Sequence, residues 1–324
     1  MSPRSKISAL IVTKDGAPLI KRLLNSVIED TELLNDLSEI VIFDNGSKDN
    51  TEEVVKGFDI NIKYIRSAEN LGFSKAVNLS AASAKGDYFL LLNSDVILPK
   101  GEILKLKKIM DENDDVAVCG PALVYPDGSP QRSYSHIPSL LNEIIPRFIY
   151  ELLFLKRSLQ KINIRFFDHP VYSTSALIGA CLLIRKKTFQ TLNGFDERFF
   201  FFLEETDFCV RVKKNGHLVL YVPAVKVIHD QGVTVRKVWM YGKTEYNISL
   251  VKFINKHHRK WYVKCFIFCR FFKTLMIVLS FLLAPFLLFS SKKRISFLFH
   301  IRLLMWFLKG LPDDYGLKKL NKLR

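Results

Sequence analysis

Asp95 follows an apolar run, Tyr88 to Leu92, with only Asn93 and Ser94 between them. Such a run is typical of a buried strand, and ligands of open α/β folds bind at the carboxyl edge of the sheet, where parallel strands end. A carboxylate at that edge can hold a hard cation such as Mg²⁺ or Mn²⁺, which prefers oxygen ligands and shares them with substrate phosphates. The pattern therefore predicts a site for a divalent metal and a diphosphate.

Asp95 is the single carboxylate of its segment, so a metal there needs a further protein ligand. His229 is the best candidate, because it ends a predicted strand, Val225 to Ile228, directly before Asp230-Gln231-Gly232. Histidine is a common metal ligand. A lone histidine is more often structural, and that alternative stays open.

Three acids, Glu204, Glu205 and Asp207, follow the aromatic run Phe199 to Phe202. Apolar surroundings raise the pKa of a carboxyl group and suit a general base. Asp207 has an alternative role, because Arg211 stands four residues further on and an ion pair at that spacing braces a helix. The segment therefore predicts an acid-base centre, with the base among these three acids.

The loop Asp44-Asn45-Gly46-Ser47 ends another predicted strand. A carboxylate there can accept hydrogen bonds from a nucleotide base or a ribose hydroxyl, while Gly46 permits a tight turn. A turn followed by a helix N-cap explains the same residues equally well.

The segment from Asn70 to Asn78 joins a predicted strand to a helix. Gly72 allows the backbone to approach a ligand, and the start of the helix offers N–H groups to phosphate. Lys75 adds a positive charge, and Asn78, one turn further, can face the same way. The alternative is an ordinary strand-to-helix connection.

Apolar runs alternate with helical patterns along the first half of the chain. The predicted strands are Ile7–Val12, Glu39–Phe43, Ile62–Arg66, Asp87–Leu92, Val116–Gly120, Ala176–Ile184, Leu218–Val222 and Val225–Ile228, and the predicted helices are Pro18–Ile28, Asp49–Val55 and Ser74–Ala84. This alternation predicts an α/β fold with a mostly parallel, Rossmann-like sheet covered by helices on both faces. The boundary of this domain is expected near residues 245 to 262, where the sheet pattern stops.

The chain carries a formal net charge of +16, which indicates an anionic partner. The basic residues gather after residue 252 among Phe, Leu and Ile, a composition that favours a membrane surface over a nucleic-acid groove. The 5 cysteines form no CxxC pair, so we expect them to be reduced. No signal-peptide pattern precedes the first strand, which places the catalytic part in the cytoplasm.

The run Thr274 to Ser291 is uncharged and is closed by Lys292-Lys293-Arg294, and the apolar segment Ile295 to Leu308 follows it. Eighteen helical residues rise about 27 Å, slightly less than the ~30 Å hydrocarbon core of a bilayer. One membrane span or a shallow re-entrant hairpin explains this pattern, and so does a pair of helices lying in the membrane plane. A buried helical pair in a soluble protein is the remaining alternative.

Taken together, the segments from Ile7 to Thr234 resemble the inverting nucleotide-sugar glycosyltransferases of family 2, which have the GT-A fold. The resemblance is strongest to the rhamnosyltransferase-like branch that builds cell-surface polysaccharide. It rests on five signatures that occur in order: Thr13, Asp44-Asn45-Gly46-Ser47, Asn70-Leu71-Gly72-Phe73, Asn93-Ser94-Asp95, and Glu204-Glu205-Thr206-Asp207 followed by His229.

The resemblance implies a role for each signature residue. It assigns the nucleotide base and ribose to Thr13, Asp44 and Asn45, the diphosphate to the loop with Asn70, Gly72, Lys75 and Asn78, and a further donor contact to Asn93. It assigns the metal to Asp95 and His229, and the catalytic base to Glu205, with Glu204 and Asp207 as alternatives. The chain departs from the family pattern at two places. The metal-binding DxD element is reduced to Asn-Ser-Asp, and Glu replaces the more usual Asp at the base position.

The resemblance further implies an enzyme with a GT-A domain at 1–245 and a membrane-associated helical region at 246–324. It would use Mg²⁺ or Mn²⁺ to move a sugar, with rhamnose as one candidate, from a dTDP- or UDP-linked donor to a hydroxyl of a lipid-linked or polysaccharide acceptor. We expect it at the cytoplasmic face of the plasma membrane, attached peripherally or by one segment, without nucleic acid. A non-catalytic, membrane-associated scaffold that binds nucleotide sugars is the alternative. The sugar, the base, the acceptor, the linkage and the oligomeric state stay open.

Overall fold

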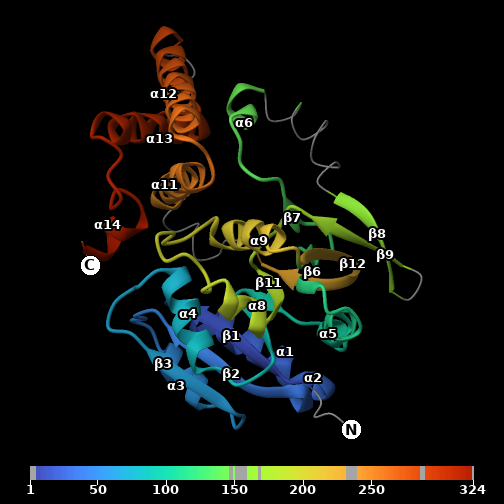
Figure 1. The fold of residues 1–324 in the computed structure, drawn as a ribbon. Coiled ribbons are helices and arrows are strands. Elements are labelled where there is room, and N and C mark those ends of the chain that lie inside the picture. The colour runs from blue at the N-terminus through green and yellow to red at the C-terminus, as the bar shows by residue number, and fades with distance from the viewer. Residues whose placement is uncertain are drawn as a thin grey trace. The chain divides into compact units, whose positions relative to one another are not determined.

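The computed structural model describes residues 5–145, 149, 159–166, 169–230, 239–284 and 289–322 (Figure 1). It forms two compact units: unit 1 comprises Met1–Ile137, Leu155–Phe200 and Glu204–Lys237, and unit 2 comprises Pro138–Phe154, Phe201–Leu203 and Val238–Arg324. Each unit is described by itself. The predicted domain boundary at residues 245 and 246 stays a prediction.

Unit 1 is built on one mixed sheet. Its strands lie in the order β3 (Ile62–Arg66), β2 (Leu37–Asp44), β1 (Ile7–Thr13), β4 (Tyr88–Asn93), β11 (Cys181–Arg185), β6 (Val116–Val124), β12 (Leu218–His229), β9 (His169–Thr174) and β8 (Leu159–Phe166), with β5 (Val96–Ile97) paired to β12. The first four strands are parallel, so their carboxyl ends share one edge. The predicted α/β fold with a largely parallel sheet is confirmed.

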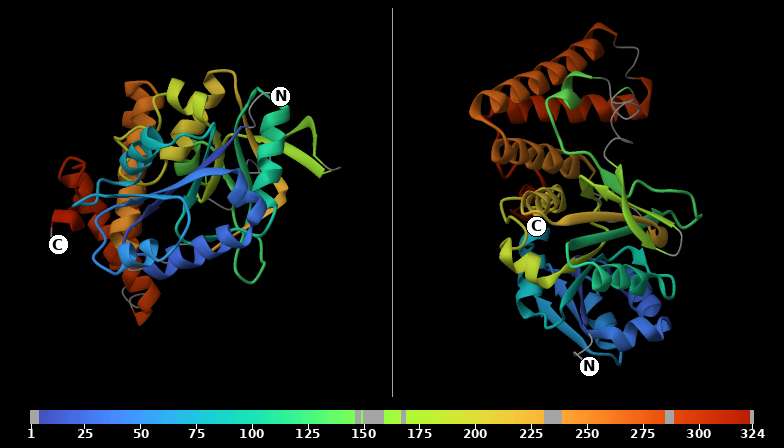
Figure 2. Two further views of the ribbon diagram at one scale, coloured as in Figure 1. Left: turned by 90° about the horizontal axis from the view of Figure 1, so that it is seen from below. Right: turned by 45° about the vertical axis from the view of Figure 1, so that its right-hand side comes forward.

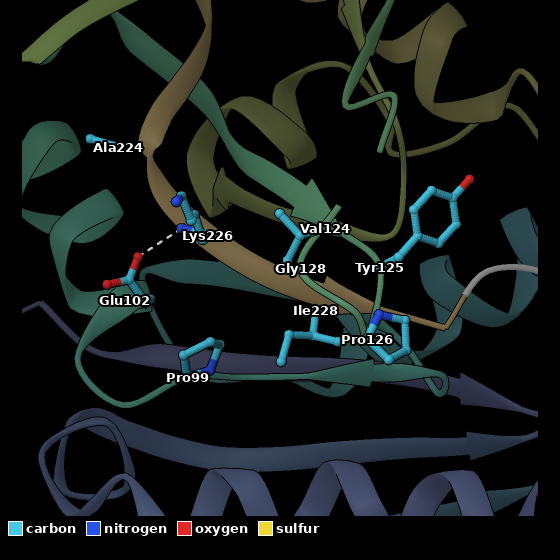
Figure 3. A pocket seen from close by; sticks show the side chains of 9 residues that line it. All are labelled: Pro99, Glu102, Val124, Tyr125, Pro126, Gly128, Ala224, Lys226 and Ile228. Carbon is cyan, nitrogen blue, oxygen red and sulfur yellow. Dashed lines mark hydrogen bonds between the residues drawn. The ribbon is translucent and has the colours of Figure 1, made fainter. Parts of the chain in front are cut away.

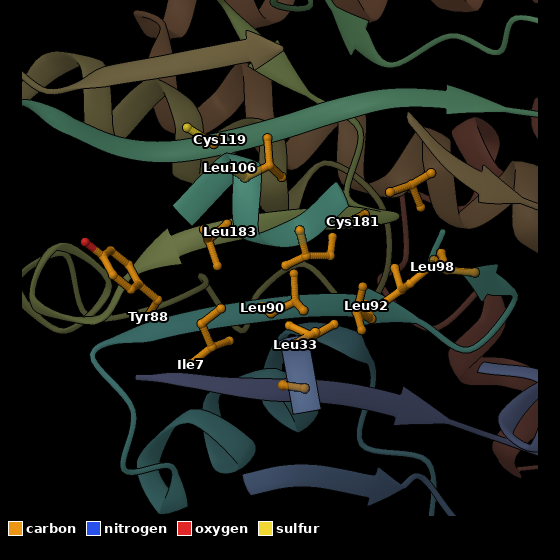
Figure 4. Packing of buried hydrophobic residues seen from close by; sticks show 14 of the residues in the cluster. Ile7, Leu33, Tyr88, Leu90, Leu92, Leu98, Leu106, Cys119, Cys181 and Leu183 are labelled. Carbon is orange, nitrogen blue, oxygen red and sulfur yellow. The ribbon is translucent and has the colours of Figure 1, made fainter. Parts of the chain in front are cut away.

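Helices cover both faces of the sheet, which Figure 2 shows from two further directions. The helices of unit 1 are α1 (Ala17–Glu29), α2 (Thr31–Asp36), α3 (Thr51–Lys56), α4 (Phe73–Ser83), α5 (Glu102–Glu112), α8 (Lys186–Thr191) and α9 (Glu204–Lys214). Residues alternate along each strand, so Ile7 and Leu90 join the core that α1 and α5 close (Figure 4). In α1, Ile20, Leu23 and Val27 recur at helical spacing and are buried, and burial of each contributes about 1.5–3 kcal/mol.

Three predicted strands are divided or joined differently in the structure. The predicted strand Ala176–Ile184 is interrupted at Ile178–Ala180, so β10 (Ala176–Leu177) pairs with β7 (Tyr134–Ser135) and β11 pairs antiparallel with β4. The predicted pair Leu218–Val222 and Val225–Ile228 is the single strand β12, whose register shifts between Val222 and Lys226. Pro223 lies in this shift, and proline donates no ladder hydrogen bond.

Unit 2 consists of helices. They are α6 (Leu141–Ile144), α11 (Trp239–His257), α12 (Lys260–Leu283), α13 (Ser291–Leu308) and α14 (Leu317–Lys322). A cluster of Ile248, Phe299, Leu303 and Trp306 joins α11 to α13. Among the described residues, α12 alone is long and apolar enough to cross a membrane, judged by length and composition. Residues 285–288 of the predicted apolar run 274–291 lie outside the described part of the chain.

Candidate active site

Asp95 and His229 come together because the short strand β5 pairs antiparallel with the end of β12, with Val96 opposite His229. The backbone N–H of Asp230 donates to the carbonyl of Asp95 at 2.9 Å and holds the two segments in register. His229 Nε2 consequently lies 3.3 Å from Asp95 Oδ1, and both side chains are largely buried. The structure thus places next to each other two residues that are 134 positions apart in the chain (229 − 95).

Gln131 binds the other side of the imidazole, and it is not among the predicted site residues. His229 Nδ1 lies 2.6 Å from Gln131 Oε1, and Gln131 Nε2 donates to the backbone carbonyl of His229 at 3.3 Å. Since an amide oxygen only accepts, Nδ1 donates to Gln131 in this arrangement, and Nε2 is the ring nitrogen that faces Asp95. Gln131 is buried and lies directly after Pro130, but no local sequence pattern marks it as part of a site.

Asp95 and His229 fit a divalent metal ion that a substrate also coordinates. One carboxylate oxygen and one imidazole nitrogen lie within reach of a shared ion, and Gln131 Oε1 binds the other imidazole nitrogen and orients the ring, as is usual for metal-bound histidine. Among the described residues no three His, Cys, Asp or Glu side chains gather to form a complete metal site. The remaining ligands would have to come from water and from the diphosphate of a substrate.

Glu205 lies in the first turn of α9, with its side chain against Gly179. Only glycine fits there comfortably, since a Cβ at position 179 would lie 3.3 Å from Glu205 Cγ. The carboxyl oxygen Oε2 is buried, and no described residue donates to it. Burial raises the pKa of Glu205 to about 7. A carboxyl group with this pKa can accept a proton near neutral pH, as a general base must.

The segment that contacts the Glu205 side chain is hydrogen-bonded to the end of β4. Residue 180 follows Gly179, and its carbonyl accepts from the backbone N–H of Asn93 at 2.9 Å. Asn93 stands two residues before Asp95. Glu205, Asn93 and Asp95 therefore lie along neighbouring segments at one edge of the sheet, the arrangement that the sequence predicted.

Of the two alternative acids, Asp207 has a strong side-chain partner. Asp207 is fully buried, and its Oδ2 accepts from Arg211 Nε at 2.8 Å. Arg211 also donates to the carbonyls of Leu192 and Gly194, so this ion pair fixes the loop before α9. Asp207 therefore braces the structure in the way that its spacing from Arg211 indicated. Glu204 is buried as well.

Thr13, Asp44 and Asn45 lie together at the ends of β1 and β2, where Thr13 is paired with Asp44. Asp44 Oδ1 accepts from the backbone N–H of Ser47 at 2.7 Å, and its Oδ2 accepts from the hydroxyl of Tyr64. Burial, followed by this bond to Asp44, raises the pKa of the Tyr64 hydroxyl. The hydroxyl oxygen of Thr13 is buried, and no described residue bonds to it.

Asn45 connects this group to the next loop. Its Oδ1 accepts from the backbone N–H of Leu71 at 2.7 Å, and its Nδ2 donates to the carbonyl of Gly72 at 3.1 Å. Gly72 has a φ of +87° and lies against Phe200, where a Cβ would approach the Phe200 carbonyl to 2.7 Å. Asn45 and Gly72 therefore shape the loop itself.

The other residues of this loop differ in exposure and in their partners. Lys75 is exposed, whereas Asn70 accepts from the backbone N–H of Gly72 through Oδ1 at 3.0 Å. The amide of Asn78 binds the backbone of Phe195 on both sides and reaches Glu197, so it fixes the connection after α8. Donor binding by these residues stays a prediction.

A separate pocket of about 470 Å³ lies among Pro99, Glu102, Tyr125, Lys226 and Ile228 (Figure 3). The backbone N–H of Lys226 donates to the Glu102 carboxylate at 2.7 Å. None of the predicted site residues lines this pocket, and its walls are mainly apolar. It is not the cavity in which the chemistry above would occur.

The fold and the arrangement at the sheet edge define a nucleotide-sugar transferase of the GT-A type. A family model described as "Glycosyl transferase family 2" matches residues 8–192, so the chain belongs to this family. A second model, "N-terminal domain of galactosyltransferase", matches residues 161–231. The prediction of a family 2 glycosyltransferase is confirmed, and the non-catalytic scaffold is not favoured.

Three curated relatives are similar over most of the chain. They are the N-acetylglucosaminyl-diphospho-decaprenol L-rhamnosyltransferase of Mycobacterium tuberculosis (27% identity, 79% of this chain and 86% of that protein), the rhamnosyltransferase WbbL of Escherichia coli K12 (28%, 68% and 81%) and the dTDP-rhamnosyl transferase RfbF of Shigella flexneri (27%, 70% and 70%). The chain is thus similar to the rhamnosyltransferase branch that the sequence indicated.

Two solved structures share the fold. The mannosyltransferase PcManGT of Pyrobaculum calidifontis, solved with GDP-Man and Mn²⁺, has a TM-score of 0.60 at 15% identity over 97% of this chain and 89% of that one. GalNAc-T7, solved with UDP, GalNAc and Mn²⁺, has a TM-score of 0.57 at 18% identity over 78% of this chain and 48% of that one.

Proposed function

We propose that this chain is an inverting rhamnosyltransferase that uses a dTDP-linked donor and a lipid-linked saccharide acceptor at the cytoplasmic face of the membrane. The names of two relatives support the donor and acceptor, since one acts on a diphospho-decaprenol saccharide and the other is a dTDP-rhamnosyl transferase. The observation that carries the proposal is the approach of His229 to Asp95 on the same sheet edge as Glu205.

In the proposed reaction Glu205 takes the proton from the acceptor hydroxyl. The oxygen attacks the anomeric carbon from the face opposite the diphosphate, the bond to the diphosphate oxygen breaks, and the configuration inverts. The buried position of the Glu205 carboxyl supports this role, since its raised pKa keeps the charged form a competent base near neutral pH. Gly179 supports this position, because its missing side chain lets the Glu205 side chain pack directly against the backbone.

Asp95 and His229 would hold a Mn²⁺ or Mg²⁺ ion together with the donor diphosphate. Such an ion supplies positive charge that stabilises the negative charge on the leaving diphosphate. Gln131 keeps Nε2 of the imidazole directed toward that position. Lys75, exposed in the first turn of α4, adds a further positive charge for the diphosphate.

The nucleotide would lie over the ends of β1 and β2. Thr13 offers a buried hydroxyl, and Asp44 offers a carboxylate that is already held in place by Ser47. Asn45 positions the Asn70 to Gly72 turn, whose backbone would face the diphosphate.

The test is a transfer assay with purified protein, dTDP-rhamnose and a short-chain polyprenyl-diphosphate N-acetylglucosamine, with UDP-sugars as competing donors. We expect transfer from dTDP-rhamnose with inversion, loss of transfer with EDTA, and restoration by Mn²⁺ or Mg²⁺. Asp95→Ala should abolish both transfer and metal-dependent nucleotide binding. Full activity of Asp95→Ala, or transfer that EDTA leaves unchanged, would contradict the metal assignment, and transfer only from UDP-sugars would contradict the donor.

A further inference from the structure

The long helix α12 carries an exposed apolar stripe along its whole length. The α12 stripe consists of Trp261, Cys265, Phe268, Phe272, Met276, Leu279 and Leu283. Successive members are three or four residues apart, so they lie on one side of a helix with 3.6 residues per turn. Trp261, Phe268 and Leu283 are 62%, 66% and 86% exposed. We propose that this stripe lies in one leaflet of an anionic bilayer, with α12 parallel to the membrane plane.

The opposite side of α12 packs within unit 2. Val263, Phe266, Val278 and Phe281 are buried there, and Phe281 contacts Phe297 of α13. The helix therefore has one side that the protein covers and one side that the described residues leave to solvent. An apolar surface of this length on a water-exposed helix marks an interaction site.

Charge near the middle of α12 argues against a membrane span. Arg270 is the eleventh of its 24 residues, and it donates to Asn247 Oδ1 at 2.7 Å and forms an ion pair with Glu143. These bonds hold the guanidinium inside unit 2, so it cannot reach a headgroup. Lys273 follows, and only ten residues of the helix remain after it (283 − 273). Ten residues rise about 15 Å, half of a ~30 Å hydrocarbon core.

The positions of the lysines fit a helix in the membrane plane. At about 100° per residue, Lys264 lies on one flank of the α12 stripe and Lys273 on the other, and both are exposed. Lysines on the flanks can keep their aliphatic stems in the apolar layer while the ammonium groups reach anionic headgroups. Exposed Lys292, Lys293 and Arg294 at the start of α13 add further charge of the same sign. This positive charge favours an anionic bilayer as the surface that the α12 stripe contacts.

The inference deepens the proposed function, because a helix in the membrane plane would hold the enzyme where a lipid-linked acceptor is anchored. It can fail independently of that function, since membrane binding is measured without donor or acceptor.

The first experiment is flotation of the full-length protein with vesicles of phosphatidylcholine alone or mixed with phosphatidylglycerol. We expect binding to the anionic vesicles that weakens with salt. Phe268→Ser/Phe272→Ser should reduce the partition coefficient about tenfold or more. Leu79→Ser, which removes an exposed apolar side chain of α4, serves as the matched control and should bind normally. Normal flotation of the double variant would overturn the proposal, as would a dimer that this variant dissociates while vesicle binding persists.

The second experiment measures depth with single nitroxide labels at positions 265, 272, 279 and 283. Cys119, Cys181 and Cys209 are buried, so Cys269 is replaced in every variant and the exposed Cys265 is replaced in the three variants that are labelled elsewhere. An in-plane helix gives one shallow depth at all four positions. A depth that changes steadily along the helix toward the far leaflet would show a span and overturn the proposal. Phe268→Ser/Phe272→Ser should still transfer sugar to a soluble acceptor analogue, so a failure here and a failure of the proposed function are distinguishable.

Discussion

Gln131 and His229 form two hydrogen bonds. His229 Nδ1 lies 2.6 Å from Gln131 Oε1, and Gln131 Nε2 donates to the backbone carbonyl of His229 at 3.3 Å. The glutamine thereby fixes the orientation of the imidazole that faces Asp95.

Replacing Gln131 should therefore weaken metal binding without removing a ligand. We expect Gln131→Leu to lower the affinity for Mn²⁺ in the presence of dTDP by about 10- to 100-fold, the usual effect of losing such a partner. Gln131→Glu keeps an acceptor for Nδ1–H and should retain most of the affinity. Titration of free Mn²⁺ by electron paramagnetic resonance measures both variants. Equal affinities of Gln131→Leu and the native protein would contradict the positioning role.

Proton transfer by Glu205 should appear in the pH dependence of the rate. Its pKa of about 7 means that the base form is scarce at low pH, so kcat/KM should rise about tenfold per pH unit up to about pH 7 and then level. Glu205→Gln should bind donor normally and lose about 10²- to 10⁴-fold in rate, together with this pH dependence. Glu204→Gln is the comparison: the Glu204 side chain hydrogen-bonds Glu205 and lowers the pKa of that carboxyl, so the variant should keep transfer while its pH profile shifts. The base would have to be reassigned if Glu204→Gln were inactive and Glu205→Gln active.

Asp207→Asn should lower the stability of the protein more than it lowers the rate of transfer. Its carboxylate is fully buried and paired with Arg211, and removal of one partner of a buried pair costs about 3–5 kcal/mol. The melting temperature should fall clearly, while Glu205→Gln should leave it unchanged or raise it. Thermal unfolding followed by circular dichroism compares the two. A native melting temperature together with lost transfer would instead give Asp207 a catalytic role.

Glu245 in α11 makes the stability of unit 2 depend on pH. Burial raises its pKa to about 7 from 4.5, so the neutral form is the stable one in the folded protein. The destabilisation is absent below about pH 4.5, grows as the pH rises to about 7, and then stays constant at about 3 kcal/mol. Glu245→Gln should therefore raise the melting temperature above pH 7 and leave it unchanged near pH 4.5.

Tryptophan fluorescence isolates this effect, because all 3 tryptophans, Trp239, Trp261 and Trp306, lie in unit 2. A Glu245→Gln protein that melts at the native temperature at pH 8 would show that the buried carboxyl finds a compensating partner.

Local sequence patterns were sufficient to predict the parallel half of the sheet and the polar residues at its edge. The runs that became β1, β2 and β4 are nearly continuously apolar because helices cover both of their faces, so their ends could be located from composition. Asp44 and Asp95 stand where those runs stop, at the edge where a ligand of this fold binds.

Contacts between segments that are remote in sequence set which residues act together. The pairing of Asp95 with His229 depends on a two-residue strand, β5, that is too short to produce a periodic pattern. Gln131 contacts His229 across 98 positions of the chain. Asn78 binds Phe195 and does not follow Lys75, and helical spacing alone does not predict which of these directions its side chain takes. The raised pKa of Glu205 comes from burial against Gly179, and Arg270 of α12 is paired with Glu143 of α6. Each of these depends on the distance between segments remote in sequence, and local patterns of hydrophobicity carry no information about that distance.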